Sequence, residues 1–182
     1  DAERFAALFA VSDLKQVAEL NGEPVGFVLA ITGGKPFENQ NYRWFTRWFT
    51  ERAEHFIYID RVSVSPACQG QGVGRTFYAA VFDAARQSGI AHVCAEMALE
   101  PPNHGSLQFH RKLGFTEIGT RMARAMWRVE NGSRCRCVRW AHKAKPHNHY
   151  SPRRRFAVPA ARLSGCDDRK IDSTPRRAGL LH

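Results

Sequence analysis

The stretch that decides the fold reads YIDRVSVSPACQGQGVGR and runs from Tyr58 to Arg75. Its first part alternates with the period of a β-strand, which would place on one face Tyr58, Asp60, Val62 and Val64. Pro66 ends the strand, because proline has no N–H group to give to a sheet. A glycine-rich turn follows at residues 69–74, and residues 75–86 carry apolar side chains at helical spacing. The stretch therefore predicts a strand, a glycine turn and a helix in direct succession.

A glycine turn that opens a helix is suited to binding an anion. The first N–H groups of a helix have no partner inside the helix, and the peptide dipoles add positive charge there. Glycines allow the backbone to approach a phosphate without a clashing Cβ atom. The turn at residues 69–74 is thus a candidate cradle for a diphosphate, and an ordinary tight turn is the alternative.

Two familiar phosphate-binding loops do not fit this turn. A P-loop ends in Gly-Lys-Ser/Thr, whereas Gly74 is followed by Arg75 and Thr76. A Rossmann fingerprint needs G-x-G-x-x-G, and the glycines here have another spacing. The turn does match Q/R-x-x-G-x-G/A through Gln69, Gly72 and Gly74. In this it resembles the pyrophosphate loop of the GNAT superfamily of acyl-CoA-dependent N-acetyltransferases.

A second stretch, PPNHGSLQFHRKLGF at residues 101–115, makes the resemblance more specific. It is similar to the other cofactor motif of that superfamily, an Asn followed by a short helix that ends in Gly-Phe. Gly114 suits the position just after the end of that helix. The resemblance extends over roughly residues 10–128, and these runs also look like one bacterial branch of predicted GNAT acetyltransferases.

The resemblance implies an α/β (α+β) fold with a mixed, mostly antiparallel central sheet flanked by helices. Apolar periodicity predicts helices over residues 3–11, 39–49, 75–86 and 106–113 and strands over residues 14–20, 25–31, 58–64, 91–98, 115–120 and 135–140. A GNAT domain has one more strand before these, so we expect that first strand to be truncated. The aromatic helix at 39–49 could form a wall of the acceptor pocket or pack into the core.

The positive charge of the chain lies mainly at its C-terminal end. The formal net charge is +10, and residues 130–182 hold thirteen Lys/Arg against four Asp/Glu. We therefore expect a GNAT domain over residues 1–140 and a basic, disordered tail over residues 141–182. The tail could instead touch nucleic acid through Arg153–Arg155, or bind zinc through Cys135, Cys137 and nearby histidines, although that spacing fits no common structural site.

No apolar run is long enough to span a membrane, and no leader peptide opens the sequence, so the expectation is a cytoplasmic protein without membrane contact. Five cysteines without framework spacing favour thiols over disulfides in that compartment. The sequence leaves the oligomeric state open, with a homodimer as one alternative.

The resemblance implies that acetyl-CoA is the acyl donor. Backbone N–H groups of Gln71–Arg75 would hold its diphosphate, and the pantetheine arm would pair with the strand at residues 62–64. Asn103 would bond the pantetheine amide, or cap the helix together with Ser106. The candidate cofactor-binding residues are Val62, Ser63, Val64, Gln69, Gly70, Gln71, Gly72, Val73, Gly74, Arg75, Asn103 and Ser106.

Acetyl transfer to an amine also needs a base and an acid. A carboxylate must accept the amine proton, directly or through a water, and the candidates are Asp60 and Glu96, each in a strand with apolar residues that could raise its pKa. Superfamily members often carry a tyrosine as the acid four residues before the Gly of Gly-Phe; here that position is His110, whose imidazole can donate a proton. Tyr78, on another helix, is the less favoured acid. No metal is expected.

These residues predict an N-acetyltransferase that moves an acetyl group directly from acetyl-CoA to a primary amine of a small molecule or peptide. The rival hypothesis is a non-catalytic acyl-CoA-binding or sensory module, which His110 in place of tyrosine keeps open. A nucleic-acid binder acting through the basic tail is a third, less favoured alternative.

Overall fold

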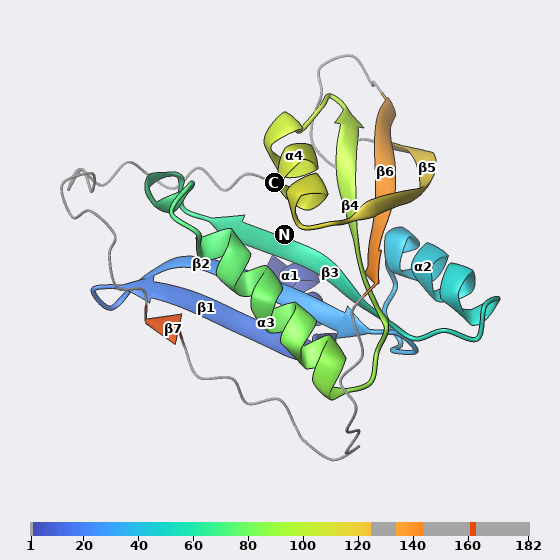
Figure 1. Ribbon diagram of the computed structural model, residues 1–182, viewed down its shortest axis with the longest axis horizontal. Coiled ribbons are helices and arrows are strands. Elements are labelled where there is room, and N and C mark those ends of the chain that lie inside the picture. The colour runs from blue at the N-terminus through green and yellow to red at the C-terminus, as the bar shows by residue number, and fades with distance from the viewer. Residues whose placement is uncertain (1, 125–133, 144–160, 163–182) are drawn as a thin grey trace.

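The computed structural model describes residues 2–124, 134–143 and 161–162 (Figure 1). The helices are α1 (Ala2–Val11), α2 (Gln40–Thr50), α3 (Val73–Gln87) and α4 (His104–Lys112), with a 3-10 turn η1 (Pro66–Cys68). The strands are β1 (Leu14–Leu20), β2 (Glu23–Thr32), β3 (Phe56–Val64), β4 (His92–Glu100), β5 (Thr116–Arg124), β6 (Arg134–Lys143) and β7 (Ala161–Arg162). Every helix and strand expected from periodicity is present, with ends that differ by a few residues.

The strands form one mixed sheet in the order β5-β6-β4-β3-β2-β1-β7. β3 pairs with β4 in parallel and β7 with β1 in parallel, and the other neighbours are antiparallel. β6 is inserted between β4 and β5, although it follows both in the sequence. The predicted fold class, a mixed and mostly antiparallel sheet flanked by helices, is confirmed.

Each face of the sheet has its own apolar core. α3 covers one face with Phe77 and Val81, and α1 lies behind the other face (Figure 1). α2 buries Tyr42, Phe45 and Phe49 on the α1 side, where their rings lie against Phe56 and Tyr58 of β3. These three aromatic residues of α2 therefore pack into the core, which is one of the two interpretations left open by the sequence.

A β-bulge in β3 changes which residues face which core. Leu29 pairs with Arg61 and Ala30 pairs with Ile59, so Asp60 is an extra residue in β3. Tyr58 consequently lies in the core on the α2 side, whereas Val62 packs on the α3 side. The uninterrupted alternation predicted for residues 58–64 is therefore wrong, because an inserted residue shifts the side-chain period by one.

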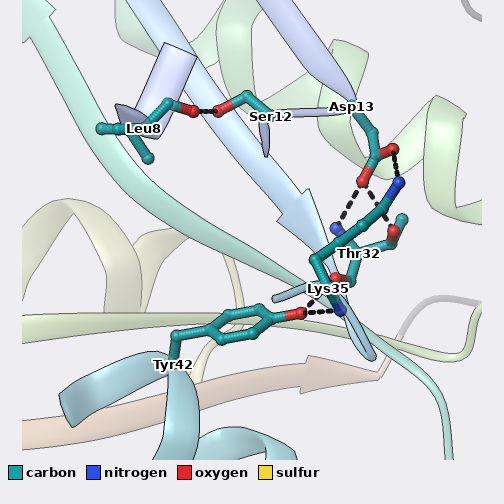
Figure 2. A network of polar contacts seen from close by, with 6 residues as sticks. All are labelled: Leu8, Ser12, Asp13, Thr32, Lys35 and Tyr42. Carbon is teal, nitrogen blue, oxygen red and sulfur yellow. Dashed lines mark hydrogen bonds and ion pairs between the residues drawn. The ribbon is translucent and has the colours of Figure 1, made fainter. Parts of the chain in front are cut away.

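A polar network fixes the corner between β1, β2 and the segment that leads to α2 (Figure 2). The Asp13 carboxylate accepts hydrogen bonds from the main chain and hydroxyl of Thr32 and forms a 2.8 Å ion pair with Lys35. The Tyr42 hydroxyl donates to the Thr32 carbonyl at 2.6 Å and accepts the Lys35 N–H at 2.7 Å. The start of α2 is thus tied to the end of β2.

β6 continues to Lys143, three residues past the expected end of the domain, and the two residues of β7 pair with Ala18 and Glu19 of β1. The rest of the tail, including Arg153–Arg155, His147 and His149, lies outside the described residues, so its disorder stays a prediction. Within the described ranges, no helix has the length and apolarity to cross a membrane, and no group of three or more His, Cys, Asp or Glu side chains could hold a metal ion.

Candidate active site

The glycine turn lies between η1 and α3 and is open to solvent. Gly70 and Gly72 have φ values of +78° and +90°, a region that L side chains rarely adopt, and a Cβ atom on either would meet nothing within 4 Å. The first hydrogen bond of α3 runs from the Thr76 N–H to the Gly72 carbonyl. The N–H groups that precede it, on Val73, Gly74 and Arg75, are the ones a helix leaves available to an anion.

Two glutamine side chains stabilise the turn rather than point away from it. The Gln69 side-chain amide donates to the Val64 carbonyl at 3.1 Å, and the Gln71 amide donates to the Ala67 carbonyl at 2.9 Å. Both bonds join the glycine turn to the segment that ends β3 and leads into it. These two bonds hold the glycine turn against the end of β3 and the η1 segment.

The parallel pair β3–β4 opens toward the glycine turn. Its register runs from Phe56–His92 to Ile59–Ala95, and no pairing between β3 and β4 is found in the described residues beyond that point. Val62, Ser63 and Val64 pair only with β2 on their other side. Figure 1 shows β3 and β4 diverging from this point. The edge of β3 that faces β4 is thus available to an extended ligand.

Asp60, the extra residue of the bulge, lies where the two strands separate. One carboxylate oxygen, Oδ1, accepts a 3.0 Å hydrogen bond from the side-chain amide of Asn39. Burial raises the pKa of Asp60 above its usual value, although the charges of Arg61 and Arg4 and a hydrogen bond from Tyr58 offset part of that effect. A half-buried carboxylate with a raised pKa suits a base.

Glu96, the other candidate base, is on the α2 side of β4 and has a different environment. It lies opposite Arg139 in the β4–β6 register, and the Arg139 Nε atom is 3.4 Å from Glu96 Oε2. The side chains are 8% and 3% exposed, and the Arg139 guanidinium also stacks over the Trp44 ring at 4.2 Å. Glu96 therefore balances a buried positive charge.

His110 is buried, and both of its ring nitrogens have partners in the protein. Nδ1 is 2.7 Å from the Ser106 carbonyl, so Nδ1 must carry the proton and donate. Nε2 is then the acceptor of a 2.6 Å hydrogen bond from the Tyr78 hydroxyl. Burial lowers the pKa of His110 and raises the pKa of Tyr78, so both groups are neutral near pH 7.

Asn103 occupies the N-cap position of α4, where its side-chain oxygen accepts the Ser106 N–H at 3.0 Å. This is the capping role that the sequence offered as the alternative to pantetheine binding. The amide nitrogen of Asn103 can still act as a donor, so its assignment to the cofactor stays a prediction.

The structure thus places Asp60 and the open edge on β3, and the glycine turn follows soon after the end of that strand. Sequence reasoning missed three contributors to the site: Asn39, Arg139 and the contact between Tyr78 and His110. A helix N-cap signal before the aromatic segment could have found Asn39. Nothing in the sequence indicated that Arg139 would lie beside Glu96, because that pairing depends on β6 entering the sheet next to β4.

A mixed sheet whose parallel pair opens beside a glycine turn and a helix N-terminus defines the class, an α/β domain of the acetyltransferase type. The chain belongs to the acetyltransferase (GNAT) family, whose sequence model matches residues 3–115.

Comparison with individual proteins agrees with this assignment. The chain is 36% identical over 59 residues to phosphinothricin N-acetyltransferase of Streptomyces coelicolor, a match that spans 32% of this chain and 33% of the relative. The match thus spans about a third of that curated relative.

Two solved structures share the fold. Naa50 of Arabidopsis thaliana, in complex with a bisubstrate CoA analogue, has a TM-score of 0.57 and 17% identity over 79% of this chain and 81% of that chain. IAA acetyltransferase of Bacillus cereus has a TM-score of 0.57 and 17% identity over 79% of this chain and 85% of that chain. At these identities the likeness concerns the fold alone.

Proposed function

We propose that this chain is an N-acetyltransferase that moves an acetyl group from acetyl-CoA directly to a primary amine of a small molecule or peptide. The observation that carries the proposal is the unpaired edge of β3 between a candidate base and an open glycine turn. Membership in the acetyltransferase (GNAT) family and the CoA analogue bound to the structurally similar Naa50 support the choice of donor. A cytoplasmic location is part of the proposal.

The donor would lie along β3. Backbone N–H groups of Gln71–Arg75 would bind the diphosphate at the positive end of α3, with Gln69 and Gly70 shaping the turn. The pantetheine arm would pair with the main chain of residues 62–64 and complete the open edge, as an added strand does. Asn103 and Ser106 would contact the arm from the start of α4.

The reaction would take place where β3 and β4 separate. Asp60 would accept a proton from the acceptor ammonium, and the freed amine would attack the thioester carbon. A C–N bond forms and the C–S bond breaks. The amine nitrogen then loses its second proton, and the leaving CoA thiolate takes up one proton, so that the step balances. We favour Asp60 over Glu96 as the base, because Glu96 already neutralises the buried Arg139.

His110 stays our candidate for the proton donor to the thiolate. In this structure both of its ring nitrogens bond to protein groups, Tyr78 and the Ser106 carbonyl. A role as acid therefore requires that Nδ1, the nitrogen that carries the proton, exchange the Ser106 carbonyl for the sulfur.

The first test is binding. At a concentration of about one hundred times its Kd, acetyl-CoA would stabilise the protein by about 2.7 kcal/mol, which corresponds to a rise in Tm of roughly 5–10 °C for a chain of this size. Thiol release with a panel of amines then tests turnover. Binding without thiol release on any amine would favour the non-catalytic acyl-CoA-binding module, and no stabilisation of a folded sample would contradict both hypotheses.

A pair of variants tests the assignment of the base. Asp60→Asn should lower kcat by about 10²–10⁴-fold while acetyl-CoA still stabilises the protein. Asp83→Asn, an exposed carboxylate on α3 beside Arg86, is the matched control and should keep full activity. If Glu96→Gln abolished turnover in a folded protein while Asp60→Asn kept it, Glu96 would be the base.

A further inference from the structure

We propose that Asn39 is a positioning residue, whose side-chain amide holds the Asp60 carboxylate in place while its oxygen caps α2. The inference rests on the proposed function, in which Asp60 is the base. Asn39 Nδ2 lies 3.0 Å from Asp60 Oδ1, and this contact joins the loop before α2 to the bulge of β3. Nothing in the two cofactor motifs points to this residue.

The orientation of the Asn39 amide is fixed by the helix that it caps. Its side-chain oxygen accepts the N–H groups of Asn41 at 2.8 Å and Tyr42 at 3.2 Å. Both partners are donors, so only the oxygen of the amide can face them. The NH2 group must then point the other way, toward Asp60. The cap thus determines that Asp60 receives a donor rather than a second acceptor.

The backbone of Asn39 is also anchored. Its N–H donates to the Phe37 carbonyl at 3.0 Å, and its carbonyl accepts the Arg43 N–H at 2.9 Å. Beyond it, α2 is held on the sheet by the buried side chains of Tyr42 and Phe45. A group on a rigid helix start positions a carboxylate better than a group on a loose loop, because its own rotamer is restricted by packing.

The charged and titratable groups that act on Asp60 come from β3 and α1. Arg61 lies beside it on β3, Arg4 acts from α1, and Tyr58 donates from β3. Glu96 of β4 acts on the same Tyr58. The Asn39 donor adds to the groups that favour the ionised carboxylate and opposes the effect of burial. It therefore favours the ionised form of Asp60 and holds Oδ1 at the start of α2.

Asn39→Ser separates positioning from capping. Serine is as good an N-cap residue as asparagine, so α2 should stay intact, but its hydroxyl cannot cap the helix and reach Asp60 together. We expect the pKa of Asp60, followed by carbon-13 NMR of its carboxyl group, to rise by about one unit in this variant. The acidic limb of the plot of kcat/KM against pH should shift to higher pH by the same amount. At a given pH on that limb, kcat/KM should therefore fall about tenfold.

Asn39→Asp provides a second, independent variant. It keeps the cap oxygen but places a second carboxylate beside Asp60, so the pKa of Asp60 should rise further than in Asn39→Ser. Thr50→Ser, at the opposite and exposed end of α2, is the matched control and should leave the Tm, the titration and the pH profile unchanged.

The titration of Asp60 tests the positioning role of Asn39, and the thiol-release kinetics test the proposed function, so either hypothesis can be contradicted without the other. If Asn39→Ser and Asn39→Asp both titrate like the original protein at Asp60, the positioning role is overturned whatever the activity. If the original protein releases no thiol with any amine, the proposed function fails, and a shifted titration still supports the link between Asn39 and Asp60. A loss of Tm equal to that of Asn39→Ala, with no change in titration, would reduce Asn39 to a helix cap.

Discussion

The Asp13 carboxylate is ionised at neutral pH and holds three parts of the chain together (Figure 2). Burial alone would raise its pKa, but hydrogen bonds from Lys35 and Thr32 outweigh that effect and leave the pKa below its usual value. A lowered pKa in the folded state means that the carboxylate stabilises the protein above the unfolded pKa of about 3.9. That contribution is lost as the pH falls through the folded pKa.

Asp13→Asn should therefore lower the free energy of unfolding by about 1 kcal/mol at pH 7, a value kept small by the exposure of Lys35. The difference from the original protein should shrink below about pH 4 and vanish once Asp13 is protonated in both states. Urea unfolding at a series of pH values measures this, with Asp83→Asn as the surface control. A difference that grew as the pH fell would mean that folding raises the pKa of Asp13 instead of lowering it.

For single residues, the sequence predicted which side chains are candidates for the site, but it did not predict which groups would surround them. Asp60 and Glu96 both lie in strands rich in apolar residues, yet one receives an amide donor and the other faces a buried guanidinium. The amide comes from a residue 21 positions earlier, and the guanidinium comes from β6, which enters the sheet late. Contacts of this kind depend on topology, so local periodicity cannot supply them.

Between elements, α3 and α4 are joined by the buried hydrogen bond from Tyr78 to His110. Tyr78→Phe would leave His110 Nε2 buried without its donor and should lower the free energy of unfolding by about 1–3 kcal/mol. The double variant Tyr78→Phe/His110→Phe should recover part of this, because it removes both polar groups. Denaturant unfolding of both single variants and the double variant gives the coupling energy. Strictly additive effects would show that the bond contributes nothing.

The sequence predicted the helices and strands well, but it did not predict that the alternation of side chains between the two faces of the sheet shifts by one residue within β3. Hydrophobic alternation locates a strand and its length, and it assumes that every residue advances the side-chain direction by one step. The bulge at Asp60 breaks that assumption, and Asp60 carries no turn signal of its own. The residue that interrupts the pattern is also the candidate base, as expected where a bulge redirects a functional side chain.

Across the whole molecule, both cofactor motifs lie within residues 3–115, the part of the chain that the family model matches. The sheet is nonetheless completed from further along. β6 lies between β4 and β5, and its Trp140 and Ala141 are buried. The domain therefore depends on residues well beyond the match, where composition has already turned basic.

Two truncations test where the domain ends. A chain that stops at Lys143 keeps β6. Among the strand pairings of the described residues it loses that of β7 with β1, which joins two residues, so we expect its urea midpoint and its stabilisation by acetyl-CoA to match those of the full chain. A chain that stops at Glu130 lacks β6, leaves the edges of β4 and β5 unpaired and should not fold. Circular dichroism and denaturant unfolding distinguish the two. If the full chain binds nucleic acid through its tail, that binding should weaken steeply with salt and be lost on stopping at Lys143. A folded, acetyl-CoA-binding chain ending at Glu130 would show instead that the sheet closes without β6.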